Sequence, residues 1–122
     1  MNHPNFVILY VESSDNSARF YSDLLELQPV ESSPVFAAYV LDSGLMFGLW
    51  ARADVEPKVM APAGGGELVF KVADRAAVDE RYSQWQAMGL GFAQSPVDME
   101  FGYTFVALDP DGNRLRVYSP AA

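Results

Sequence analysis

The side chains best suited to ligand binding stand at alternate positions of the segment "RLRVYSP", near the end of the chain. Side chains alternate between the two faces of a strand. Arg114, Arg116 and Tyr118 therefore fall on one face, and Leu115 and Val117 on the other. Guanidinium groups donate paired, charge-assisted hydrogen bonds to acceptors. We expect the arginine face to look into a binding cleft and the leucine face to join the core.

The segment "ELVFKV", residues 67–72, offers a second strand with charges on one face. Glu67 and Lys71 alternate with Leu68, Phe70 and Val72, which read as core residues. One or two such charges would orient a ligand that apolar surfaces hold. We therefore add Glu67 and Lys71 to the predicted ligand-binding residues.

Aromatic side chains and one flexible methionine supply the remaining predicted contacts. Phe6 and Tyr10 come from "FVILYV", Met46 and Trp50 from "LMFGLW", and Tyr103 from "YTFVALD". An aromatic floor with few polar groups suits a flat, partly apolar molecule. The alternative is that individual aromatic residues belong to the core. The alternation leaves the inward face of residues 35–42 and 103–109 open.

The composition excludes several kinds of chemistry. The chain has no cysteine and a single histidine, His3. A disulfide framework, a thiolate metal site and a cysteine nucleophile are therefore absent. No histidine lies in a predicted strand or helix where it could act as a base for the serines of the two "ESS" stretches, and "GGGE" lacks the lysine of a phosphate-binding loop.

The charge balance argues against a polyanionic partner. The formal net charge is −8, from 16 acidic residues against 8 lysines and arginines. Nucleic-acid binding relies on basic patches, so it is not expected. The acid excess favours cationic small molecules, or serves solubility alone. The apolar run near the start is too short for a signal peptide or a membrane span, so we expect a cytoplasmic protein without membrane contact.

The order of predicted elements repeats along the chain. Each half reads as a strand, a helix and three further strands, over about residues 5–50 and 67–119, with a Pro/Gly-rich linker at 51–66. Ser14 or Asp15 is the expected N-cap of the first helix. The second helix carries an apolar face and ends at a glycine; the residues concerned are Val78, Tyr82, Trp85, Met88 and Gly89.

The pattern predicts an α+β fold made of two βαβββ modules. Each module would bury one sheet face under its helix, so the other faces would form a half-open, barrel-like sheet around a shared cleft with the helices outside. The residues that would line this cleft are Phe6, Tyr10, Met46, Trp50, Glu67, Lys71, Tyr103, Arg114, Arg116 and Tyr118.

The repeated unit, the opening "FVILYVESSDNSARFYSDLLEL" and the close "ALDPDGNRLRV" resemble the vicinal oxygen chelate superfamily over essentially the whole chain. This superfamily groups glyoxalase I, extradiol dioxygenases, fosfomycin-resistance enzymes and the bleomycin-resistance binding proteins. The resemblance implies two modules that curl around a cleft, and a homodimer.

The same resemblance assigns the metal-ligand positions of the catalytic members to Phe6, Gly48, Glu67 and Arg116. Glu67 alone has a side chain that binds a divalent ion, and Arg116 brings a positive charge to that place. We expect an ion pair between Glu67 and Arg116. The chain is therefore most similar to the metal-free binding branch, with no cofactor and no catalytic residue.

The sequence thus predicts a metal-independent protein that sequesters an aromatic or cationic drug-like compound, as antibiotic-resistance proteins of this type do. The alternative is a metal-dependent lyase or dioxygenase of the same superfamily. Its ion would be held by Glu67 together with Asp98 or Glu100, or with residues of a second chain.

Overall fold

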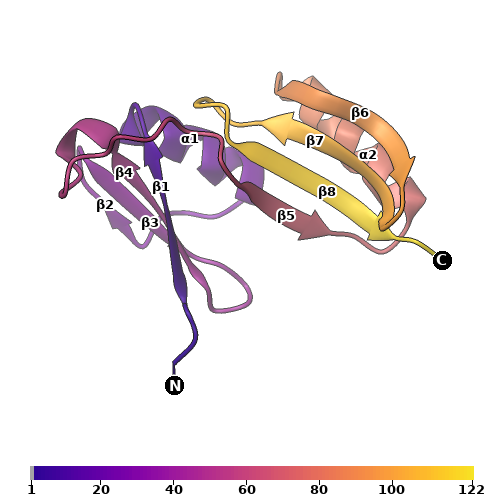
Figure 1. Ribbon diagram of the computed structural model, residues 1–122, viewed down its shortest axis with the longest axis horizontal. Helices are drawn as coiled ribbons and strands as arrows, with labels where there is room; N and C mark the ends of the chain where they lie inside the picture. The colour runs from indigo at the N-terminus through magenta and orange to yellow at the C-terminus, as the bar shows by residue number, and fades with distance from the viewer. Residues whose placement is uncertain (1) are drawn as a thin grey trace. The chain divides into compact units, whose positions relative to one another are not determined.

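The computed structural model describes residues 2–122. The chain divides into two compact units between Ala63 and Gly64, inside the stretch that the sequence predicts as a linker. We call them the N-terminal and the C-terminal module and describe each by itself. In both, one helix lies against one side of a four-stranded sheet (Figure 1).

The N-terminal module runs β1, α1, β2, β3, β4 and a single 3-10 turn. Its sheet has the order β1-β4-β3-β2, with β1 parallel to β4 and the other neighbours antiparallel. The elements are β1 (Phe6–Val11), α1 (Ser14–Leu25), β2 (Glu31–Ser32), β3 (Phe36–Val40), β4 (Met46–Ala51) and η1 (Arg52–Asp54).

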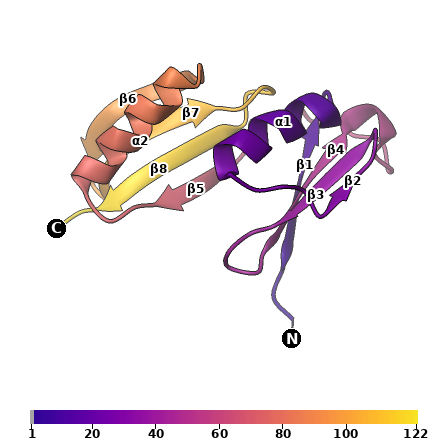
Figure 2. The same cartoon turned by 180° about the vertical axis from the view of Figure 1, so that it is seen from behind.

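Helix α1 begins one residue earlier than predicted. The N-cap is Ser13, whose hydroxyl oxygen accepts a hydrogen bond from the backbone N–H of Asn16, so the prediction of Ser14 or Asp15 is wrong. On the sheet side, Tyr21 is fully buried and its ring lies 4.9 Å from that of Phe47 on β4. These contacts fix which face of the sheet the helix covers (Figure 2).

The C-terminal module repeats the same arrangement. Its sheet has the order β5-β8-β7-β6, again with the first strand parallel to the last and the other pairs antiparallel. The repeat of a βαβββ unit is thereby confirmed. The elements are β5 (Glu67–Lys71), α2 (Arg75–Ala87), β6 (Gly91–Met99), β7 (Gly102–Leu108) and β8 (Arg114–Pro120).

Helix α2 packs on its sheet through Val78 and Trp85, which are 0% and 2% exposed. The Trp85 ring lies 5.5 Å from the rings of both Phe70 and Phe105. Met88 is exposed, so its predicted place on the buried face is wrong, because the helix ends at Ala87 and Met88 is already the C-cap. Gly89 then takes a positive φ of 87°, as expected for a helix end.

The turn "DPDGN" is held by one carboxylate. Asp109 Oδ1 accepts hydrogen bonds from the backbone N–H groups of Asp111 and Asn113, and its Oδ2 accepts from the Asn113 amide. The side chain of Asn113 in turn accepts from the N–H of Gly64, at 3.1 Å. This network fixes the start of β8, and hence the positions of its arginines.

The predicted α+β class is confirmed: each module is an open sheet with one helix on one side. The shared cleft between the modules stays a prediction. No helix among residues 2–122 is long and apolar enough to span a membrane.

Candidate ligand-binding faces

The sheet face opposite α1 carries the aromatic residues that the sequence singles out. In the register of β1 and β4, Phe6 lies beside Met46 and Tyr10 beside Trp50. Antiparallel pairing of β3 with β4 adds Phe36 beside Trp50, a residue that the sequence analysis missed. Strand alternation alone puts Phe36 and Tyr39 on opposite faces, but it does not say which face is inward.

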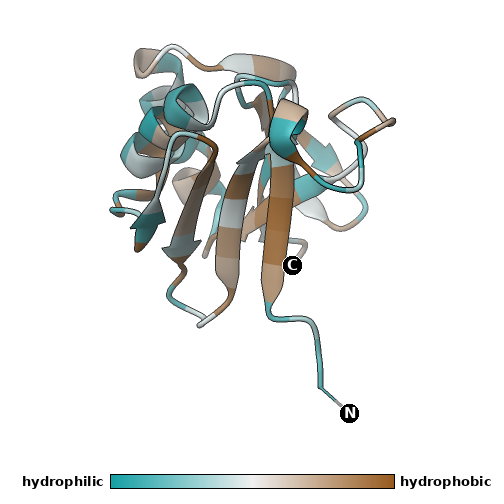
Figure 3. Cartoon of the chain, turned by 90° about the vertical axis from the view of Figure 1, so that its left-hand side faces the viewer, coloured by the Kyte–Doolittle hydropathy of each residue, from teal (hydrophilic) through white to brown (hydrophobic). Residues whose placement is uncertain are grey.

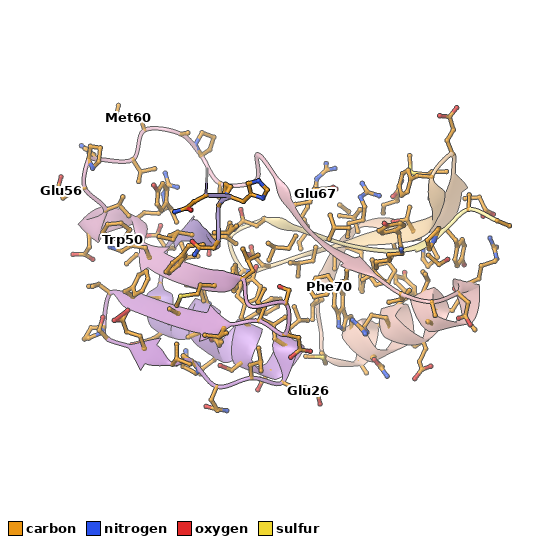
Figure 4. The ribbon with its side chains drawn as sticks, turned by 90° about the horizontal axis from the view of Figure 1, so that it is seen from below. Glu26, Trp50, Glu56, Met60, Glu67 and Phe70 are labelled. Carbon is orange, nitrogen blue, oxygen red and sulfur yellow. The ribbon has the colours of Figure 1, made fainter. Side chains whose placement is uncertain are left out.

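The four rings on this side form what we call the aromatic face, namely Phe6, Tyr10, Phe36 and Trp50. The Trp50 ring meets the rings of Tyr10 and Phe36 edge to face, at centroid distances of 6.4 and 6.2 Å. Phe6 is 38% and Tyr10 41% exposed, so both present ring surface to solvent. Figure 3 shows β1 as strongly hydrophobic along its length, and Figure 4 marks Trp50 on β4.

Gly48 is the reason that two of these rings approach the sheet so closely. Gly48 lies on β4 and is buried. Its neighbours on this face are Phe6 of β1 and Phe36 of β3. A Cβ placed on Gly48 would lie 2.9 Å from Cε1 of Phe6 and 3.1 Å from Cζ of Phe36. The rings occupy the space that any side chain at this position would need.

The open face of the C-terminal module is polar, and we call Glu67, Lys71, Arg114, Arg116 and Tyr118 its charged face. The predicted ion pair is confirmed: Arg116 Nε donates to Glu67 Oε1 at 2.8 Å and Nη2 donates to Oε2 at 3.1 Å. The two side chains are 16% and 29% exposed. Figure 4 labels Glu67 and Phe70 on opposite sides of β5, which separates this face from the core.

Thr104 of β7 completes the support of the guanidinium and was not predicted. Arg116 Nη1 donates to the Thr104 hydroxyl oxygen at 3.2 Å. That hydroxyl donates to the carbonyl oxygen of Val117 at 2.8 Å. Thr104 is fully buried. The guanidinium is therefore held by two strands besides its own.

Aromatic surface adjoins the charged face as well. The Arg116 guanidinium carbon lies 5.6 Å from the centroid of the Phe101 ring, within cation–π distance. The Tyr118 ring meets Phe101 edge to face at 5.8 Å. Phe101 lies in the turn between β6 and β7, where no strand periodicity could have pointed to it.

Tyr103 lies on the opposite side of this sheet. Its hydroxyl donates to Asp79 Oδ1 of α2 at 2.7 Å, and the Arg75 guanidinium carbon lies 3.9 Å from its ring centroid. The hydrogen bond to Asp79 raises the pKa of Tyr103 above its ordinary value. Its predicted place beside Arg116 is therefore wrong: in β7 it is Thr104, not Tyr103, that faces the guanidinium.

The residues at the predicted metal positions do not fit a divalent cation. Phe6 and Gly48 have no donor atom, and both oxygens of Glu67 accept from Arg116. Asp98, proposed as a substitute ligand, forms an ion pair with Arg75. It is paired in register with Tyr103 and so lies on the helix side, away from Glu67. Residues 2–122 hold no cluster of three or more side chains that could ligate a metal.

Comparison with known proteins decides the family. The model of the Glyoxalase/Bleomycin resistance protein/Dioxygenase superfamily matches residues 2–117. The chain belongs to this superfamily. Its members include both enzymes and binding proteins. Membership therefore establishes the fold, and the function has to be inferred from the residues of the site.

Three known proteins are similar to this chain over most of its length. It is 26% identical over 117 residues to the phenazine antibiotic resistance protein EhpR of Enterobacter agglomerans, covering 93% of this chain and 89% of EhpR. A protein from Agrobacterium tumefaciens, solved by NMR, is 52% identical over the full length of both chains, with a TM-score of 0.91. A glyoxalase-related enzyme from Fulvimarina pelagi shares the fold, with a TM-score of 0.83, 21% identity and coverage of 98% and 88% of the two chains.

Proposed function

We propose that this chain is a metal-independent binding protein of the bleomycin-resistance type, which sequesters a planar aromatic compound on its aromatic face. The observation that carries the proposal is the set of four rings on this face: Phe6 and Phe36 fill the space beside Gly48, and the Trp50 ring meets those of Tyr10 and Phe36. Rings bind rings by stacking and by edge-to-face contact, and together they bury a large apolar area. Binding would withdraw the compound from its target, and no reaction is required for that effect.

Two further observations support the proposal. A relative that matches nearly the whole chain is a phenazine antibiotic resistance protein, and phenazines are flat tricyclic aromatics. The donor set at the metal positions of the family's enzymes is replaced by Phe6, Gly48 and a guanidinium, which leaves Glu67 alone to offer oxygen atoms. Of the two ligand classes predicted from the sequence, aromatic and cationic, the site favours the aromatic one.

Fluorescence titration tests the proposal. The chain has two tryptophans, Trp50 on the aromatic face and Trp85 in the core under α2. Phenazine added to the protein is expected to quench Trp50 with a saturable curve. Absence of saturable quenching across a panel of phenazines, acridines and anthraquinones at high micromolar concentration would overturn the proposal.

A homodimer and a cytoplasmic location remain predictions that accompany this function. Sedimentation velocity at several protein concentrations tests the first, with a mass of twice 13.4 kDa expected. Fractionation of the producing cells tests the second.

A further inference from the structure

We infer that the aromatic compound carries a hydrogen-bond acceptor at the edge of its ring system, a ring nitrogen or a carbonyl oxygen, and that Tyr10 and Trp50 donate to it. The inference rests on the proposed function, because it specifies the polar atom of the compound that the aromatic face binds. It concerns the N-terminal module alone.

The first observation is that Tyr10 and Trp50 hold the polar atoms of an otherwise apolar sheet face. Strands β1, β3 and β4 each place three residues on this side, in register with one another. A compound lying on these strands meets side-chain polar atoms at the Tyr10 hydroxyl and the Trp50 indole N–H. The residues of the three strands that offer no such atom on this side are Phe6, Ile8, Phe36, Ala38, Val40, Met46 and Gly48.

The second observation is that neither polar atom is used within the described chain. The Tyr10 hydroxyl and the Trp50 indole nitrogen have no hydrogen-bond partner among residues 2–122. Over the same residues, the buried side-chain nitrogen and oxygen atoms without a partner belong to Ser14 and Gln94. The two unpaired groups of the aromatic face are therefore accessible to solvent.

This accessibility makes the choice of ligand selective. An indole N–H can only donate, so its complement must be an acceptor. A compound with an acceptor replaces the water that the donor loses on binding, whereas a pure hydrocarbon leaves the covered donor unpaired. Compounds with an acceptor at the ring edge are favoured over hydrocarbons of the same shape for that reason.

The third observation is that the two donors lie next to each other. Tyr10 on β1 and Trp50 on β4 are partners in register, and their ring centroids are 6.4 Å apart. Phe36 meets the Trp50 ring as well, at 6.2 Å. Rings that are already packed lose little conformational freedom when a ligand arrives. Two neighbouring donors can serve one edge of a planar compound.

The charges of this module argue against a carboxylate as the acceptor. Glu31 on β2 is the register partner of Ala38, so it lies on the same side of the sheet as the aromatic face, and it is exposed. Strands β1 to β4 contain no lysine or arginine. Glu31 would repel an anion bound within a Debye length of it. An uncharged ring nitrogen or carbonyl oxygen avoids this repulsion.

Titration of ¹⁵N-labelled protein followed by NMR tests the inference. The probes are naphthalene, quinoxaline and 1,4-naphthoquinone, which are flat two-ring compounds with no acceptor, ring nitrogens and carbonyl oxygens respectively. Tyr10→Phe removes the hydroxyl and keeps the ring. We expect it to weaken binding of quinoxaline, of naphthoquinone or of both by about threefold to tenfold, and to change naphthalene binding by less than about twofold. The probe with the larger loss identifies the acceptor.

The indole N–H signals give a second readout. The chain has two tryptophans, and Trp85 is buried under α2, so Trp50→Phe assigns both signals. At saturation, an acceptor probe should move the Trp50 indole proton to lower field than naphthalene does. Naphthalene serves as the control for the ring-current effect of a bound aromatic. The Trp85 signal should stay in place with every probe.

Two further variants separate the hydroxyl from other effects. Tyr118→Phe removes a tyrosine hydroxyl from β8 of the C-terminal module and should leave the affinity of every probe unchanged. Glu31→Gln should tighten the binding of quinoxaline-2-carboxylate by about twofold to threefold and leave quinoxaline unchanged.

Two kinds of outcome count against the inference in different ways. An equal loss of affinity for all three probes in Tyr10→Phe, or a Trp50 indole proton that responds alike to all three, overturns the inference and leaves the proposed function standing. Failure of the three probes and of phenazine to bind the native protein removes the proposed function itself.

Discussion

Arg116 on β8 reaches diagonally to Glu67 on the neighbouring strand β5, although Val69 is its partner in register and Arg114 is the residue directly opposite Glu67. Of the two arginines on this face, the one that forms the ion pair is the one that also reaches Thr104. The guanidinium held from two sides is therefore that of Arg116, and Arg114 is exposed at the start of β8.

The ion pair predicts a specific pattern of stability changes. Arg116→Met leaves the partly buried Glu67 without its partner and should lower the free energy of unfolding by about 1–2 kcal/mol. The double variant E67Q/R116M should lose less free energy of unfolding than Glu67→Gln and Arg116→Met lose in sum, with a coupling energy of about 1 kcal/mol. Urea denaturation followed by circular dichroism measures both. Strict additivity would show that the two residues do not stabilise each other.

Gly48→Ala should damage the aromatic face. The added methyl group would lie 2.9 Å from the Phe6 ring and 3.1 Å from the Phe36 ring, so the rings must move. We expect a loss of stability of about 1–3 kcal/mol and weaker phenazine binding. Gly65→Ala is the matched control, because nothing lies within 4 Å of its Cβ. Equal effects of the two substitutions in thermal melts and titrations would contradict the packing argument.

Trp50 should report ligand binding, and Trp85 should not. Trp50→Phe keeps a ring on the aromatic face, so phenazine should still bind by calorimetry while the quenching signal disappears. Trp50→Ala should weaken binding about tenfold or more, as loss of an aromatic anchor does. Trp85→Phe alters the core and should retain the quenching. Quenching that persists in Trp50→Phe and disappears in Trp85→Phe would show that the ligand does not bind on the aromatic face.

The hydrogen bond between Tyr103 and Asp79 predicts a stability difference that depends on pH. The pKa of Tyr103 is raised in the folded protein by this bond, so the folded state holds the phenol proton more tightly than the unfolded chain does. The contribution is complete below the ordinary tyrosine pKa near 10 and is lost as the pH rises through the folded value. Tyr103→Phe should therefore cost up to about 1 kcal/mol at pH 7, and this cost should shrink once the pH rises above the ordinary tyrosine value.

Tyr118→Phe is the control for this measurement. The Tyr118 hydroxyl has no hydrogen bond among the described residues, so its removal should change the free energy of unfolding at pH 7 by no more than about 0.5 kcal/mol. A difference between Tyr103→Phe and the native protein that persists undiminished at high pH would contradict the assignment.

Much of the fold and part of the site could be predicted from the sequence. Strand alternation placed Arg116 and Glu67 on one face, and the repeat placed Trp50 and Tyr10 on the other module's open face. In β3 and β7 almost every residue is apolar, so alternation could not tell inside from outside. Tyr103 was assigned to the wrong face for that reason, and Phe36 and Thr104 were missed. Phe101 lies in a turn, where position depends on the strands around it.

Binding in the absence of metal tests the central claim most directly. The native protein is treated with EDTA, shown to be metal-free by elemental analysis, and titrated with phenazine by calorimetry, then again with Mn²⁺, Ni²⁺ or Zn²⁺ present. We expect saturable binding with the same affinity in every titration and no chemical change in the recovered probe. Binding or turnover that appears only when one of these ions is added would contradict the account.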